Sequence, residues 1–81
     1  MIKVYGADWC HDTKDVQKFL DENKVEYQYI NVDENPEASE WVKKQNNGKE
    51  RKPTISIGDK ILSTPSEEEL KSALKANGLT V

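Results

Sequence analysis

The stretch YGADWCHDTK, residues 5–14, holds the only cysteine of the chain and joins a predicted strand to a predicted helix. Upstream, residues 1–5 alternate apolar and polar side chains with the period of a β-strand. Downstream, a helix is predicted over residues 11–23, because its inward-facing residues recur at three- and four-residue spacing: Thr13, Val16, Phe19 and Leu20. Cys10 is therefore expected at or just before a helix N-terminus. The unpaired amides and the positive end of the helix macrodipole favour a thiolate there.

Two interpretations of Cys10 compete. A lone cysteine is often a small buried apolar residue. Here the neighbouring residues form a polar, loop-like setting, and the apolar face of the helix starts only after them: Asp8, Trp9, His11 and Asp12. A thiolate is the nucleophilic form, so we interpret Cys10 as reactive. Lys14, and His11 when it is protonated, would favour the thiolate, whereas Asp8 and Asp12 oppose it, and the sequence leaves that balance open.

The composition predicts one small domain over residues 1–81. Of the 81 residues, 33% are charged, and the mean hydropathy is -0.89. One cysteine excludes an internal disulfide and a four-cysteine zinc site, so no metal is expected. The net charge of -3 and the pI near 5.1 disfavour nucleic acid and anionic membranes as partners. No apolar run approaches the roughly 18 residues that span a bilayer, and a free thiol is typical of the cytoplasm.

The remaining elements follow from periodicity and turn residues. A second strand is predicted over residues 26–32, and the intervening helix makes it parallel to the first. A helix then enters at residues 33–36 and ends near residues 45–48. Residues 54–57 and 60–62 form a hairpin, and the last helix starts at the N-cap Ser66, with Glu69 completing a capping box, and ends at residues 77–78.

The expected fold class is α/β with the order βαβαββα: a four-stranded mixed sheet with helices on both faces. Lys49–Lys52 is a short basic cluster in the loop before the hairpin. The predicted core draws on eleven residues: Ile2, Val4, Val16, Phe19, Leu20, Ile30, Trp41, Ile55, Ile57, Leu70 and Leu74.

Taken together, these features resemble the thioredoxin superfamily and, within it, the glutaredoxin family. The resemblance rests on Trp9-Cys10-X-X-Thr13 after the first strand, on Pro53 directly before the third strand, and on Ser66-Glu67 at the last helix. The Leu-X-X-Pro-Ser segment at residues 62–66 is most similar to mycoredoxin-like members. This chain departs from the family in having Thr13 for the second cysteine, Arg51-Lys52 before Pro53 in place of Thr-Val, and Ser63-Thr64 for the usual Gly-Gly.

The resemblance implies a one-cysteine thiol–disulfide oxidoreductase that needs no tightly bound cofactor. Its co-substrate would be a glutathione-like low-molecular-weight thiol, its partners would be protein mixed disulfides, and it would act as a monomer. The implied catalytic residues are Cys10 and Thr13, whose hydroxyl either hydrogen-bonds the thiolate or serves only the helix start. The implied substrate-binding residues are Trp9, His11, Arg51, Lys52, Pro53, Thr64, Ser66 and Glu67. The Lys52-Pro53 bond is expected to be cis, and Arg51 and Lys52 would supply positive charge to an acidic thiol.

Two further functions fit the same sequence. One is a carrier that holds a [2Fe–2S] cluster between two chains, each giving Cys10, with two small thiols as the other ligands. Single-cysteine relatives of that kind typically carry Gly-Phe where this chain has His11-Asp12. The other is a redox-silent interaction domain. Visible absorbance separates the carrier from the rest, and thiol reactivity separates the enzyme from the silent domain.

Overall fold

The computed structural model describes residues 2–78 and contains the predicted order of seven elements. These are β1 (Ile2–Gly6), α1 (His11–Glu22), β2 (Gln28–Asn31), α2 (Pro36–Gln45), β3 (Thr54–Ile57), β4 (Lys60–Ser63) and α3 (Glu67–Ala76). The second strand is four residues long, whereas seven were predicted. The first helix is one residue shorter than predicted and ends at Glu22. Met1, predicted in the first strand, lies outside the described residues.

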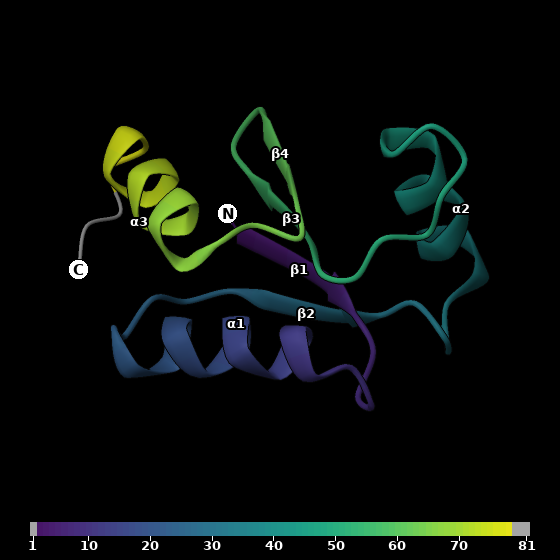
Figure 1. The fold of residues 1–81 in the computed structure, drawn as a ribbon, viewed down its shortest axis with the longest axis horizontal. Coiled ribbons are helices and arrows are strands. Elements are labelled where there is room, and N and C mark those ends of the chain that lie inside the picture. Colours follow the sequence, from purple (N-terminus) through teal and green to yellow (C-terminus); the bar gives the residue numbers. More distant parts are fainter. Residues whose placement is uncertain (1, 79–81) are drawn as a thin grey trace.

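The four strands form one mixed sheet in the order β2-β1-β3-β4. β1 and β2 are parallel, as the crossover through α1 predicts, and the β1–β3 and β3–β4 pairs are antiparallel. Figure 1 shows α2 set apart from α1 and α3. Because β1 and β2 are parallel, the loops that follow both strands leave the sheet at the same edge. None of the helices within residues 2–78 is long and apolar enough to cross a bilayer.

The hydrophobic core is divided by the sheet into two clusters. Side chains of β1 and β3 pack with α1 and α3 on one face, and this cluster holds nine of the eleven predicted core residues. Tyr5, Val32, Ala38 and Val42 form the second cluster beneath α2. The other two predicted core residues, Ile30 and Trp41, are only partly buried and pack against the α2 cluster. Trp41 stacks on Tyr5 with ring centroids 4.5 Å apart.

The starts of α2 and α3 carry the caps that their sequences indicate. Asn35 accepts a hydrogen bond from the Ala38 amide at 3.2 Å. At α3 the predicted capping box is present, because Ser66 Oγ accepts from the Glu69 amide at 3.2 Å and Glu69 accepts from the Ser66 amide at 3.1 Å. These caps fix where each helix begins relative to the sheet. α1 differs, because its N-cap residue is Cys10 and the Cys10 side chain makes no capping hydrogen bond.

Gly6, the last residue of β1, packs against the side chain of Thr13 on α1. A Cβ atom on residue 6 would lie 2.5 Å from Thr13 Oγ1 and 3.0 Å from Thr13 Cβ, and Thr13 is fully buried. We therefore expect Gly6→Ala to lower the free energy of unfolding by about 1–3 kcal/mol, measured by urea denaturation. Adding Thr13→Ala, which removes the nearest atoms, should recover part of that loss. Unchanged stability of Gly6→Ala would contradict this packing.

Candidate active site

Cys10 lies at the start of α1, in the loop that follows the C-terminal end of β1. The Cys10 amide donates to the Ala7 carbonyl at 3.1 Å, and the Cys10 carbonyl accepts from the Lys14 amide at 3.1 Å. Helix geometry leaves the amides of residues 11–13 without intrahelical acceptors. The partly buried Cys10 side chain is therefore beside the positive end of the helix, as predicted.

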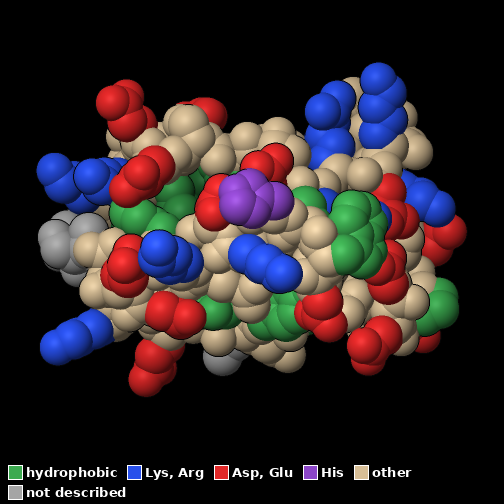
Figure 2. Space-filling view, turned by 60° about the horizontal axis from the view of Figure 1, so that its bottom comes forward, with side chains coloured by type: hydrophobic (Ala, Val, Ile, Leu, Met, Phe, Trp, Pro, Cys, Tyr) green, Lys and Arg blue, Asp and Glu red, His purple; other side chains and the backbone are tan. Residues whose placement is uncertain are grey.

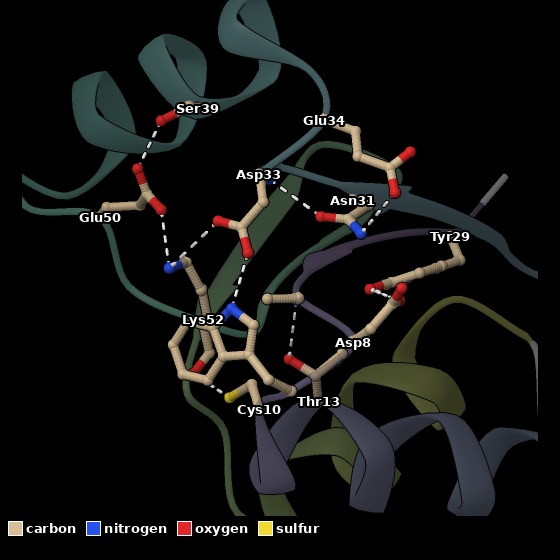
Figure 3. Close-up of polar contacts among 12 residues, drawn as sticks. Asp8, Cys10, Thr13, Tyr29, Asn31, Asp33, Glu34, Ser39, Glu50 and Lys52 are labelled. Atoms are coloured by element: carbon tan, nitrogen blue, oxygen red, sulfur yellow. Dashed lines mark hydrogen bonds and ion pairs between the residues drawn. The ribbon is translucent and has the colours of Figure 1, made fainter.

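The sulfur of Cys10 meets a segment 42 residues further along the chain. Cys10 Sγ lies 3.8 Å from the carbonyl oxygen of Lys52 (Figure 3). The Lys52-Pro53 bond that follows is cis, which confirms the prediction, and Pro53 is buried directly before β3. The Pro53 carbonyl accepts from the Thr64 amide at 2.8 Å, which ties this segment to the end of β4. Thr64 has a φ of 43°, in the left-handed region that favours glycine.

Thr13 is placed under the loop that carries Cys10. Its Oγ1 accepts a hydrogen bond from the Ala7 amide at 3.5 Å, and its side chain is fully buried. This contact joins the loop to the first turn of α1. A hydrogen bond from the Thr13 hydroxyl to a Cys10 thiolate stays a prediction.

Asp8, one of the two acids near Cys10 in the sequence, is hydrogen-bonded to a side chain of the edge strand β2. The Tyr29 hydroxyl on β2 donates to Asp8 Oδ1 at 2.8 Å. Burial, and then the hydrogen bond to Asp8, raise the pKa of Tyr29 well above its ordinary value, so the hydroxyl keeps its proton and remains a donor at neutral pH. Asp8 is thereby oriented toward β2.

A cavity of about 500 Å³ lies between α1 and the start of α3. Four predicted substrate-binding residues line it: Pro53, Thr64, Ser66 and Glu67. Its lining begins two residues after Cys10, at Asp12, and includes Pro53 beside the sulfur-contacting carbonyl. The ionisable residues of the lining are one lysine, Lys18, and four acids: Asp12, Asp15, Glu22 and Glu67. Figure 2 shows acidic side chains interspersed with basic ones on this side of the molecule.

The other four predicted substrate-binding residues lie outside the lining of this cavity. His11 has an 87% exposed side chain and lies 3.5 Å from Asp15 on the next turn of α1. Arg51 is exposed in the loop before β3. Trp9 and Lys52 lie together, with Lys52 Nζ 4.6 Å from the centre of the indole. Within residues 2–78, no group of three or more His, Cys, Asp or Glu side chains is arranged to hold a metal ion.

A chain of polar contacts connects Trp9 and Lys52 to α2. Trp9 Nε1 donates to Asp33 Oδ2 at 2.6 Å, and Lys52 Nζ lies 3.9 Å from Asp33 Oδ1 and 2.8 Å from Glu50 Oε1. Ser39 on α2 donates to Glu50. Figure 3 shows Ser39, Glu50 and Lys52 running from α2 toward Cys10. The positive charge of Lys52 is therefore already balanced by two carboxylates of the protein.

The sequence interpretation missed Asp33, Glu50 and Ser39. The sequence did contain a signal for Asp33. It follows β2 just as Cys10 follows β1, and the C-terminal ends of two neighbouring parallel strands lie on the same side of the sheet. Glu50 was treated only as part of the basic cluster Lys49–Lys52, because its partner Ser39 lies on a helix eleven residues earlier. That pairing depends on how α2 packs against the sheet.

The Lys52 and Ser39 hydrogen bonds lower the pKa of Glu50 below its ordinary value of 4.5. A carboxylate with a lowered folded-state pKa stabilises the fold above its unfolded pKa, and this contribution disappears as the pH falls through the folded value. We expect Glu50→Gln to cost roughly 1 kcal/mol at pH 7, with the difference from wild type shrinking below pH 4.5. Urea denaturation at several pH values measures this. Glu40→Gln, at an exposed ion pair on α2, is the matched control. A difference that stayed constant down to pH 3 would contradict the assignment.

Three comparisons with known proteins match most of the chain to the same family or fold. Residues 2–62 match the family model named Glutaredoxin. Mycoredoxin 1 of Corynebacterium glutamicum is 36% identical over 76 residues, which cover 93% of this chain and 94% of that protein. The crystal structure of a glutaredoxin from Archaeoglobus fulgidus superimposes with a TM-score of 0.75 at 26% identity, covering 91% of this chain and 85% of the other. A crystal structure of a thioredoxin-like protein gives a TM-score of 0.81 at 24% identity, covering 91% and 100%, and shows the shared fold.

Proposed function

This chain belongs to the glutaredoxin family, and we propose that it reduces mixed disulfides between proteins and a low-molecular-weight thiol through Cys10 alone. The observation that carries the proposal is the position of its single cysteine. Cys10 lies at a helix start, against the carbonyl before the cis Pro53, and close to a cavity large enough for a small thiol. Thr13 replaces the resolving cysteine of two-cysteine relatives, so a second small thiol must complete the cycle.

The cycle consists of two exchange steps. The Cys10 thiolate attacks the small-thiol sulfur of the mixed disulfide, forming a Cys10–small thiol disulfide and releasing the protein sulfur as a thiolate, which takes up a proton. A second small thiol, as its thiolate, then attacks the sulfur of the small thiol bound to Cys10. The products are the symmetric small-thiol disulfide and the regenerated Cys10 thiolate. The two electrons that reduce the protein come from the small thiols.

The chain's own groups support each requirement of this cycle. Cys10 is the N-cap residue of α1, so the positive end of the helix lies beside the sulfur in both exchange steps. The segment before Pro53 supplies backbone groups beside the sulfur, and the cavity behind it extends to the capped start of α3. A helix N-terminus binds carboxylates through its free amides.

We further propose that the protein acts as a monomer in the cytoplasm.

The charge of the cavity predicts how the protein discriminates among thiols. The sequence suggested that Arg51 and Lys52 attract an acidic thiol, but Lys52 is paired with Asp33 and Glu50, and the cavity itself is lined mainly by carboxylates. We therefore expect kcat/KM for the anion glutathione to rise about two- to threefold as ionic strength increases from roughly 0.01 to 0.15 M, because salt screens the repulsion. The uncharged thiol 2-mercaptoethanol should show no such trend. A fall with salt would instead support attraction by Arg51 and Lys52.

The test of the proposed function is turnover of a glutathionylated protein or peptide with glutathione as reductant, followed through the glutathione disulfide formed. Wild-type protein should turn over repeatedly with its single thiol. Absence of turnover together with an unreactive Cys10 would support the redox-silent domain. Visible absorbance of protein purified without oxygen would support the cluster carrier.

A further inference from the structure

Trp9 is held in place although it is exposed. Its side chain is the one large apolar group with high exposure among residues 2–78, at 68%. An exposed side chain usually samples several rotamers, and ordering it costs free energy when a partner binds. Here the indole N–H donates to Asp33 at 2.6 Å, and the ring takes the Lys52 ammonium at 4.6 Å from its centre. These two contacts fix both the direction and the tilt of the ring beside Cys10.

The groups that hold Trp9 are themselves fixed. The Lys52 side chain is only 15% exposed and is balanced by Glu50 at 2.8 Å and Asp33 at 3.9 Å. Glu50 is anchored to α2 through Ser39. Asp33 is exposed, but its amide donates to Asn31 Oδ1 at 2.9 Å, which orders the turn that carries it (Figure 3). None of these carboxylates contacts the sulfur.

We propose that Asp33 and Glu50 are positioning residues that hold Trp9 as a preorganised platform for the protein side of the mixed disulfide. This inference rests on the proposed function. Asp33 acts directly on the indole, and Glu50 acts through Lys52. The cavity between α1 and α3 receives the small thiol, while Trp9, which stands outside that lining, contacts the protein chain that carries the disulfide. Asp33 and Glu50 therefore affect substrate binding more than the chemical step.

The first test is spectroscopic and needs no turnover. The chain has two tryptophans, so Trp41→Phe, which keeps an aromatic ring against Tyr5, leaves Trp9 as the only indole. In this background, Asp33→Ala should lower the fluorescence anisotropy of Trp9 and increase its quenching by acrylamide. Glu50→Gln should give a smaller change of the same sign. Glu40→Gln removes one carboxylate from α2 outside this network and should give no change. Equal anisotropy in wild type and Asp33→Ala would overturn the proposal.

The second test separates positioning from a merely structural role. Asp33→Ala should raise KM for a glutathionylated protein about three- to tenfold, the size expected for one lost hydrogen bond, and change kcat less than about twofold. In a Trp9→Phe background, which lacks the indole N–H, the effect of Asp33→Ala on KM should shrink. An undiminished effect in that background, or an effect confined to kcat, would overturn the proposal. If wild type lacks turnover, the proposed function fails, and the anisotropy measurement still decides whether Asp33 and Glu50 hold Trp9.

Discussion

Replacing Cys10 by Ser should abolish turnover of mixed disulfides, reducing kcat/KM to below about one-thousandth of wild type. A hydroxyl in the same position is not ionised near neutral pH and cannot form the disulfide on which both exchange steps depend. The fold should be unaffected, because the Cys10 side chain makes no capping hydrogen bond and, within residues 2–78, its one polar contact is the 3.8 Å approach to Lys52. The free energy of unfolding should change by less than about 0.5 kcal/mol.

The measurement pairs steady-state kinetics with urea denaturation of the same preparation. Glu40→Gln, an exposed substitution outside the site, controls for the handling of a variant protein. Turnover by Cys10→Ser above the uncatalysed rate would mean that the reaction does not pass through Cys10. Lost activity accompanied by lost stability would mean that the cysteine supports the fold, contrary to its contacts.

Thr13→Cys should convert the protein into a two-cysteine oxidoreductase. Residue 13 lies in the first turn of α1, three residues after Cys10, and a Cys-X-X-Cys pair across that turn brings its sulfurs within bonding distance. Oxidation should then remove both free thiols, whereas oxidised wild type has no second thiol with which to close an internal disulfide. The variant should reduce ordinary protein disulfides such as those of insulin, a reaction that wild type should barely catalyse. The Ala7 amide exchanges a hydroxyl acceptor for sulfur, so a loss of roughly 1 kcal/mol of stability is expected.

Thr13→Ser is the control for Thr13→Cys, because it keeps the hydroxyl acceptor without adding a thiol. Titration of free thiols before and after oxidation, with mass spectrometry to exclude dimers linked between chains, decides the outcome. Two free thiols remaining after oxidation would show that the first turn of α1 does not bring positions 10 and 13 together as the structure has them.

The order of elements was predictable because each one has a local signal. Alternation in β1, helical spacing in α1 and the Ser66–Glu69 capping box are all contained within one element. The cis Pro53 was predictable only through the family resemblance, since nothing local to Lys52-Pro53 distinguishes cis from trans. The second strand was predicted too long because Tyr27 and Val32 have strand-forming side chains but pack against the core from positions just outside the strand.

What the sequence did not reveal depends on packing between distant elements. Periodicity identifies apolar positions without saying on which side of the sheet they fall, so the division of the core into two clusters, with Ile30 and Trp41 beside α2, could not be predicted. The interpretation of Cys10 as the reactive residue came from its local context and stays a prediction. The contacts of Trp9 and Lys52 with Asp33 and Glu50 join two loops and a helix, and charges that pair across loops look like ordinary solvated charge in the sequence.

The central claim, that Cys10 exchanges with small-thiol disulfides, is tested most directly by intact-protein mass spectrometry after brief exposure to glutathione disulfide. We predict that a single glutathione adduct forms, that peptide mapping places it on Cys10, and that it disappears when reduced glutathione is added. Cys10→Ser should acquire no adduct. A wild-type protein that remains unmodified under conditions in which free cysteine reacts, or an adduct that reduced glutathione does not remove, would contradict the account.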